Sequence, residues 1–117
     1  MFTLTQHVSK LCGYAPALPT PFRSDGSVDI VSLERLCERQ IERGANALVV
    51  CGTTGEAPTL TAAEHRSIVT ATVRIANRRV PIIAGAGSNS TAHAIALTKD
   101  AEAAGADATL SIVPYYN

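Results

Sequence analysis

Short apolar runs alternate along this chain with longer segments in which apolar residues recur at helical spacing. The runs have the length and aliphatic content of buried strands, and the longer segments carry the apolar stripe of helices packed on one face. Successive runs begin about 30 residues apart, which is the size of a β-α-β unit. Such alternation predicts an α/β fold, a parallel sheet with its helices outside. We expect strands at 14–20, 47–51, 80–84 and 108–113, and helices at about 29–43, 61–77 and 90–104.

Local signals indicate where the helices begin. Asp29, Thr61 and either Asn89 or Ser90 can cap the three helices, and Thr61 with Glu64 has the spacing of a capping box. The first apolar run contains prolines, which cannot donate to a ladder, so we expect that strand to be irregular. The two later runs, ALVVC and ATLSIV, are continuous and are expected to be buried strands.

The length limits how much of a fold this chain can complete. Its 117 residues allow one domain, 1–117, and neither a linker nor a second domain is expected. Four parallel strands cannot close a (β/α)₈ barrel, which needs eight strands and about 250 residues. The chain therefore forms either a small open sheet or the first half of something larger. A half barrel would leave strand edges and apolar side chains uncovered, so we expect it to self-associate.

Charge and cysteine content exclude several classes of protein. Ten Lys and Arg balance ten Asp and Glu, so the electrostatic footprint of a nucleic-acid binder is missing. The longest uncharged stretch, 80–98, contains proline and glycines and is not a membrane span. Residues 1–10 lack the apolar core of a signal peptide. Three cysteines cannot all pair and have no metal-binding spacing, so we expect free thiols and a cytoplasmic protein.

The sequence Gly52-Thr53-Thr54-Gly55-Glu56 follows a predicted strand at the edge where parallel α/β folds bind ligands. Its glycines let the backbone approach a ligand closely, so N–H groups and two hydroxyls can converge on one anion. Because the loop has no Lys or Arg, such a cradle suits a carboxylate better than a polyphosphate. The alternative is an ordinary turn whose hydroxyls bond to the local backbone, and the motif alone does not exclude it.

Other candidate residues are less specific. The run 85–90, GAGSNS, lacks the last glycine of a dinucleotide-binding loop and reads as a turn that caps a helix. Tyr115 and Tyr116 could transfer protons, although tandem aromatics more often pack in a core or an interface. His65 and His93 lie on different predicted helices and form no metal-binding pattern, so no metal is expected.

Four motifs together resemble one family. Residues 19–22 (PTPF), 52–56 (GTTGE), 84–89 (AGAGSN) and 114–117 (PYYN) are similar, in order and spacing, to the signatures of the dihydrodipicolinate synthase and N-acetylneuraminate lyase family of class I aldolases. GTTGE followed by PYYN favours the synthase branch. The resemblance covers essentially the whole chain but only the N-terminal half of the family's (β/α)₈ barrel. It implies a lyase that condenses pyruvate with aspartate semialdehyde through a lysine Schiff base, in lysine and diaminopimelate biosynthesis.

The resemblance also implies roles for individual residues. Thr53 and Thr54 would hold the pyruvate carboxylate, and Thr53 and Tyr116 would be catalytic as parts of a hydroxyl relay. Family members assemble as tetramers of tight dimers, and Tyr116 would reach the neighbouring subunit's site. The family uses no cofactor besides its covalent lysine. A dimer interface, which binds the inhibitor lysine in some members, would include four residues: Tyr115, Asn89, His93 and His65.

Departures from the family pattern restrict these expectations. The Schiff-base lysine and the arginine for the second substrate belong to a segment of the family that this chain lacks, and neither Lys10 nor Lys99 is at a predicted strand end. We therefore expect the 117 residues alone to be inactive. His93 stands where lysine-inhibited members often carry an acid, which argues against feedback by lysine. A related sugar-acid aldolase or dehydratase, an inactive truncated paralogue and an interaction module remain alternatives.

Overall fold

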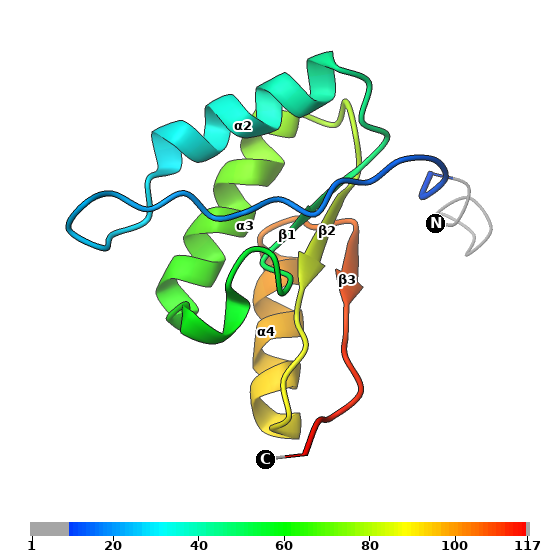
Figure 1. Cartoon of the computed structure of the whole chain (residues 1–117). Coiled ribbons are helices and arrows are strands. Elements are labelled where there is room, and N and C mark those ends of the chain that lie inside the picture. Colours follow the sequence, from blue (N-terminus) through cyan, green and yellow to red (C-terminus); the bar gives the residue numbers. More distant parts are fainter. Residues whose placement is uncertain (1–9, 117) are drawn as a thin grey trace.

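The computed structural model describes residues 10–116. Asn117 and nearly all of residues 1–10, the stretch compared above with a signal peptide, lie outside the described residues. Three parallel strands form one sheet in the order β1-β2-β3, and the helices lie along one side of it (Figure 1). The strands are β1 (Leu48–Val50), β2 (Ile82–Gly85) and β3 (Ala108–Leu110). The helices are α2 (Ile30–Glu42), α3 (Ala62–Ala76) and α4 (Thr91–Ala103), with a 3₁₀ turn η1 at Ala57–Thr59.

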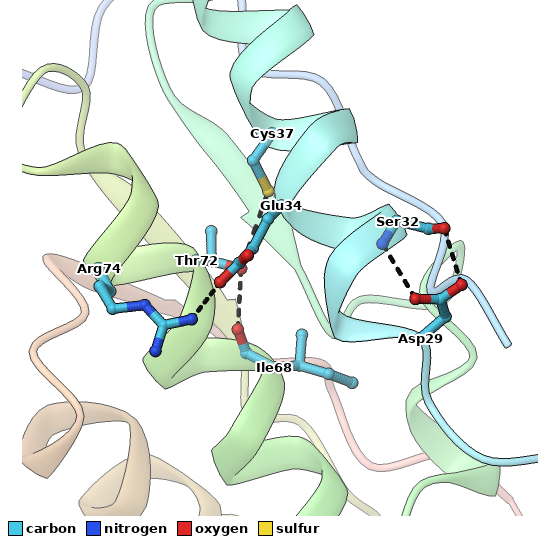
Figure 2. A network of polar contacts seen from close by, with 7 residues as sticks. All are labelled: Asp29, Ser32, Glu34, Cys37, Ile68, Thr72 and Arg74. Carbon is cyan, nitrogen blue, oxygen red and sulfur yellow. Dashed lines mark hydrogen bonds and ion pairs between the residues drawn. The ribbon is translucent and has the colours of Figure 1, made fainter. Parts of the chain in front are cut away.

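Each helix begins at a polar cap that the sequence predicted. The Asp29 carboxylate accepts hydrogen bonds from the backbone N–H and the hydroxyl of Ser32, and these bonds lower the pKa of Asp29 (Figure 2). The capping box of α3 is confirmed, since Thr61 and Glu64 bond to each other's backbone N–H groups. Of the two candidates for α4, the structure selects Ser90, whose hydroxyl accepts from the N–H of His93 at 3.3 Å.

The first predicted strand, 14–20, is irregular, as its prolines led us to expect. Residues 14–20 run beside β1 but form a single bridge, between Ala17 and Val49. Val49 donates its N–H to Pro16 at 3.0 Å and accepts from the N–H of Leu18 at 2.9 Å. Proline on this segment cannot extend the pairing, and β1 ends where Cys51 adopts a left-handed φ of 55°. Residues 10–116 therefore contain three regular strands, where about four strands were predicted.

Helix α2 packs against α3, and both cover the β1 and β2 part of the sheet. Leu33 of α2, Ile68 of α3, Leu48 of β1 and Ile82 of β2 are fully buried there. The strands were expected to be buried on both faces, but alternate residues such as Val49 are only half-buried. The core therefore lies between the sheet and the helices, and the opposite face of the sheet is partly open.

Charged residues of α2 pair with arginines of α3 and of the segment just after it. Glu34 pairs with Arg74 of α3, and Glu38 accepts two hydrogen bonds from Arg79 at 2.6 and 2.7 Å (Figure 2 shows the first pair). The bond with Arg79 lowers the pKa of Glu38. These ion pairs are exposed, so each contributes little to stability, but they join α2 to α3 and to the residues that follow it.

The expectation that 108–113 is a buried strand is also wrong. β3 covers only its first half and lies at the edge of the sheet, with no strand on its outer side among residues 10–116. Leu110, Ile112 and Val113 are exposed, Val113 by 87%. The apolar run fits a strand with neighbours on both sides, but in this chain only β2 pairs with it.

Candidate functional site

A cleft of about 460 Å³ lies at the carboxyl ends of the three strands. Its walls come from the turn after β1, the start of α3, the loop between β2 and α4, and the segment after β3. Five of the seven residues predicted for the site line this cleft, namely Thr53, His65, Asn89, His93 and Tyr115. Thr54 and Tyr116 are not in its walls. The fold therefore gathers most of the predicted residues, which are far apart in sequence.

The turn at 52–56 is built from its own backbone. Gly55 and Glu56 donate their N–H groups to the carbonyls of Gly52 and Thr53, both at 3.0 Å. Thr53 and Thr54 occupy the middle of the turn with exposed side chains. Within residues 10–116, neither their N–H groups nor their hydroxyls have a hydrogen-bond partner. The hydroxyls do not cap the local backbone, so the ordinary-turn alternative lacks the bonds it requires, and the donors are available to an anion.

Cys51 sets the direction of this turn. It is a non-glycine residue in the left-handed region, a conformation that strains most side chains, and it turns the chain sharply out of β1. Its carbonyl lies against Gly85 of β2 so closely that a Cβ on Gly85 would be 1.9 Å from the Cys51 oxygen. Only glycine at position 85 allows this approach.

His65 supports the same contact from α3. The side chain is 3% exposed, and its Nε2 lies 2.7 Å from the carbonyl oxygen of Gly85. Because the carbonyl can only accept, Nε2 carries a proton and donates it to this bond. Nδ1 is buried and has no partner in the described part of the chain. The imidazole therefore lines the cleft and holds the end of β2.

His93 lies on the opposite wall in the first turn of α4. Its ring is exposed, and Nδ1 is 3.2 Å from the hydroxyl of Ser88. Residues 10–116 contain no group of three His, Cys, Asp or Glu side chains that could hold a metal ion. Among the described residues, no Asp, Glu, Lys or Arg lines the cleft. Its polar groups are amides, hydroxyls, imidazoles and one thiol.

The two tyrosines are placed differently. Tyr115 is about half exposed and lines the cleft, whereas the side chain of Tyr116 is fully exposed. The described residues include no hydrogen bond between Tyr116 and Thr53. The predicted relay places Tyr116 in the site of a neighbouring subunit, so the relay stays a prediction.

Among the described residues, no primary amine of the kind that forms an imine lines the cleft. Lys99 is exposed on α4, and neither it nor Lys10 is among the lining residues. The Cys51 thiol does line the cleft, but burial raises its pKa to about 12, so it is a neutral thiol near pH 7. Cys37 and Cys51 are free thiols, as predicted.

Three residues that shape the site were missed by sequence reasoning. These are Thr20, Cys51 and Gly85, whose contacts hold the turn in position. Gly85 left a usable signal, because a glycine at the end of an apolar run often marks a close backbone approach. A left-handed cysteine and a hydroxyl bond across 35 residues leave no local signal.

Known proteins are similar to this chain in sequence and in fold. The model of the Dihydrodipicolinate synthetase family matches residues 10–117. The chain belongs to this family. The 4-hydroxy-tetrahydrodipicolinate synthase of Acidiphilium cryptum is 54% identical over 105 residues, which are 90% of this chain and 36% of that protein. The synthase of Rhizobium meliloti is 56% identical over the same shares.

Solved structures of the dihydrodipicolinate synthetase family show the same fold. The crystal structure of the chloride-inhibited synthase from Acinetobacter baumannii, complexed with pyruvate, is 53% identical and superposes with a TM-score of 0.87. It matches 89% of this chain and 36% of that chain. The three-stranded sheet is thus part of a (β/α)₈ barrel, as the motifs predicted, and the chain spans only about a third of its relatives' length.

Helices in the described part of the chain are all too short or too polar to cross a membrane.

Proposed function

We propose that this chain is the N-terminal part of a pyruvate-dependent class I aldolase and provides the carboxylate-binding part of its site. The observation that carries the proposal is the turn at 52–56. Thr53 and Thr54 present unpartnered N–H groups and hydroxyls at the carboxyl end of β1, in a chain 54% identical to a 4-hydroxy-tetrahydrodipicolinate synthase. This arrangement suits an anion with a single negative charge, because the turn offers hydrogen-bond donors but contains no Lys or Arg.

In this reaction the chain supplies some of the required groups and not others. A primary amine attacks the keto carbon of pyruvate, the carbonyl oxygen leaves as water, and the imine loses a methyl proton to give an enamine. The enamine carbon then attacks the aldehyde of aspartate semialdehyde. In this scheme Thr53 and Thr54 orient the carboxylate, and Thr53 with Tyr116 carries protons. The amine comes from outside this chain, since its two lysines are absent from the cleft walls.

A borohydride trap tests where the amine comes from. The 117-residue chain is incubated with pyruvate and borohydride, and its mass is measured. We expect no adduct. A stable adduct on Lys10 or Lys99 would overturn the assignment.

A chimaera tests the function itself. The chain is joined to the part of the Acidiphilium cryptum synthase that lies beyond the aligned region, and condensation of pyruvate with aspartate semialdehyde is assayed. We expect activity, and we expect Thr53→Val to lower it by about 100-fold, since positioned proton transfer contributes at least that much. Thr59→Val is the matched control, because Thr59 is exposed in the same loop and bonds only to the Glu56 carbonyl. An inactive chimaera would favour the inactive paralogue.

The remaining cleft residues belong to an interface and effector region in this proposal. Tyr115, Asn89, His93 and His65 would line it, and the exposed Tyr116 would enter the site of a neighbouring subunit in a homotetramer of the cytoplasmic enzyme. His93 offers an imidazole where a lysine side chain would need a carboxylate. We therefore expect lysine not to inhibit the chimaera, and His93→Glu to introduce inhibition if the region binds it.

A further inference from the structure

Thr20 connects the N-terminal segment to the turn that carries Thr53 and Thr54. It lies between two prolines and is 7% exposed. Its hydroxyl donates to the carbonyl oxygen of Gly55 at 2.6 Å, across 35 residues of sequence. Gly55 is buried as well, so water does not replace this bond readily.

The segment that presents this hydroxyl is held on both sides. Leu18 donates its N–H to Val49 of β1 at 2.9 Å, and the Pro21 carbonyl accepts from the N–H of Asp29, the N-cap of α2, at 2.9 Å. Thr20 is therefore fixed to the sheet through Leu18 and to the start of α2 through Pro21. Its hydroxyl is a rigid anchor rather than a mobile group.

Gly55 also packs tightly against the same segment. A Cβ at Gly55 would be 3.2 Å from the Leu18 carbonyl oxygen and 3.1 Å from the Cys51 nitrogen. The Gly55 N–H in turn closes the turn by donating to Gly52. Any shift of Gly55 thus moves the two threonines between these glycines.

We propose that Thr20 is a positioning residue for the carboxylate-binding turn, a role that rests on the function proposed above. Thr20 does not touch the carboxylate. It fixes Gly55, and Gly55 fixes the angle at which the N–H groups and hydroxyls of Thr53 and Thr54 converge. Such preorganisation is what lets neutral donors bind an anion without reordering the loop each time.

The test compares Thr20→Val with Thr72→Val in the 117-residue chain. Valine keeps the shape of threonine and removes the hydroxyl. Thr72 is the matched control, because it is fully buried and donates to the Ile68 carbonyl at 2.8 Å, within α3 (Figure 2). Both variants lose one buried hydroxyl-to-carbonyl bond, but only one of these bonds holds the turn.

The first readout is amide hydrogen exchange at Gly55, Glu56 and Ala57, whose N–H groups close the turn. We expect Thr20→Val to speed exchange there by about tenfold relative to the amides of α3, because it strands a buried carbonyl. Thr72→Val should leave the turn's rates unchanged relative to α3. Equal behaviour of the two variants would overturn the proposal.

The second readout is a pyruvate titration followed at the amides of Thr53 and Thr54. We expect weaker binding in Thr20→Val, by roughly tenfold, and recovery in Thr20→Ser, which restores the donor. If the unsubstituted chain does not bind pyruvate while Thr20→Val still loosens the turn, the proposed function fails and the anchoring role stands. If binding is present but neither readout responds, the anchoring role fails alone.

If the Thr20→Val chain does not fold, the Thr20→Ser chain is used to test the proposal instead. Serine keeps the hydroxyl and loses a methyl group. Retained protection of the turn in a less stable Thr20→Ser chain supports the proposal, and turn exchange that rises in step with α3 overturns it.

Discussion

Gly85→Ala is the substitution to which this structure should respond most strongly. The added Cβ would lie 1.9 Å from the Cys51 oxygen, 2.5 Å from the Cys51 carbonyl carbon and 2.9 Å from the Gly52 nitrogen. A carbon and a carbonyl oxygen in contact are ~3.3 Å apart, so the two backbones must separate by about 1.4 Å. All three atoms are backbone, so no side-chain rotation relieves the clash.

The cost has two parts. Overpacking of a well-packed interior costs about 1–3 kcal/mol. The shift also weakens the bond from His65 to the Gly85 carbonyl, now 2.7 Å long, which contributes about 0.5–1.5 kcal/mol. We expect the free energy of unfolding to fall by about 2–4 kcal/mol. With a urea m value of ~2 kcal/mol/M, the midpoint should fall by roughly 1–2 M.

The assay is urea unfolding of the 117-residue chain, followed by circular dichroism, with Gly52→Ala as the matched control. Gly52 is at the same edge of the sheet, and a Cβ there would meet only the Val49 side chain, at 3.9 Å. We expect Gly52→Ala to change the free energy of unfolding by less than ~0.5 kcal/mol. A Gly85→Ala chain as stable as Gly52→Ala would refute the close approach of β2 to the turn.

Three further predictions follow from local contacts. Thr61→Ala removes the hydroxyl that caps α3 and should cost about 1 kcal/mol in urea unfolding, whereas Glu64→Gln, which keeps an acceptor for the Thr61 N–H, should cost less. Burial raises the pKa of Cys37 to about 11 and that of Cys51 to about 12, whereas thiols of the unfolded chain ionise near ~8.5. The free energy of unfolding therefore does not depend on these two thiols below about pH 8.5, and it falls as pH rises toward 11, at up to ~1.4 kcal/mol per pH unit and thiol. Cys37→Ala should reduce this slope when urea unfolding is repeated across the pH range. Val113→Lys at the exposed segment after β3 should shift the chain toward monomer in sedimentation, and unchanged association would contradict self-association through that apolar edge.

The helices and their caps could be predicted from the sequence because their signals are local. Asp29, Thr61 and Ser90 each act on an N–H three residues away, so a short window contains both partners. The first strand and the burial of 108–113 could not be predicted in this way. Both depend on what lies beside them: prolines and the left-handed Cys51 shorten one pairing, and β3 has a neighbour on one side only.

The functional site likewise combines residues that the local sequence reveals with residues that are set by contacts between distant segments. The residues that offer donors, Thr53 and Thr54, are contiguous and follow a buried strand, so their sequence alone suggests an anion. The residues that hold them in place come from other segments: Thr20 from before α2, Gly85 from β2 and His65 from α3. Each of these is fixed by a contact to a backbone carbonyl rather than by its own chemistry. A GTTGE sequence without those three contacts would be the ordinary turn that its composition permits, so the capacity to bind a carboxylate belongs to the packing of the sheet around the motif as much as to the motif.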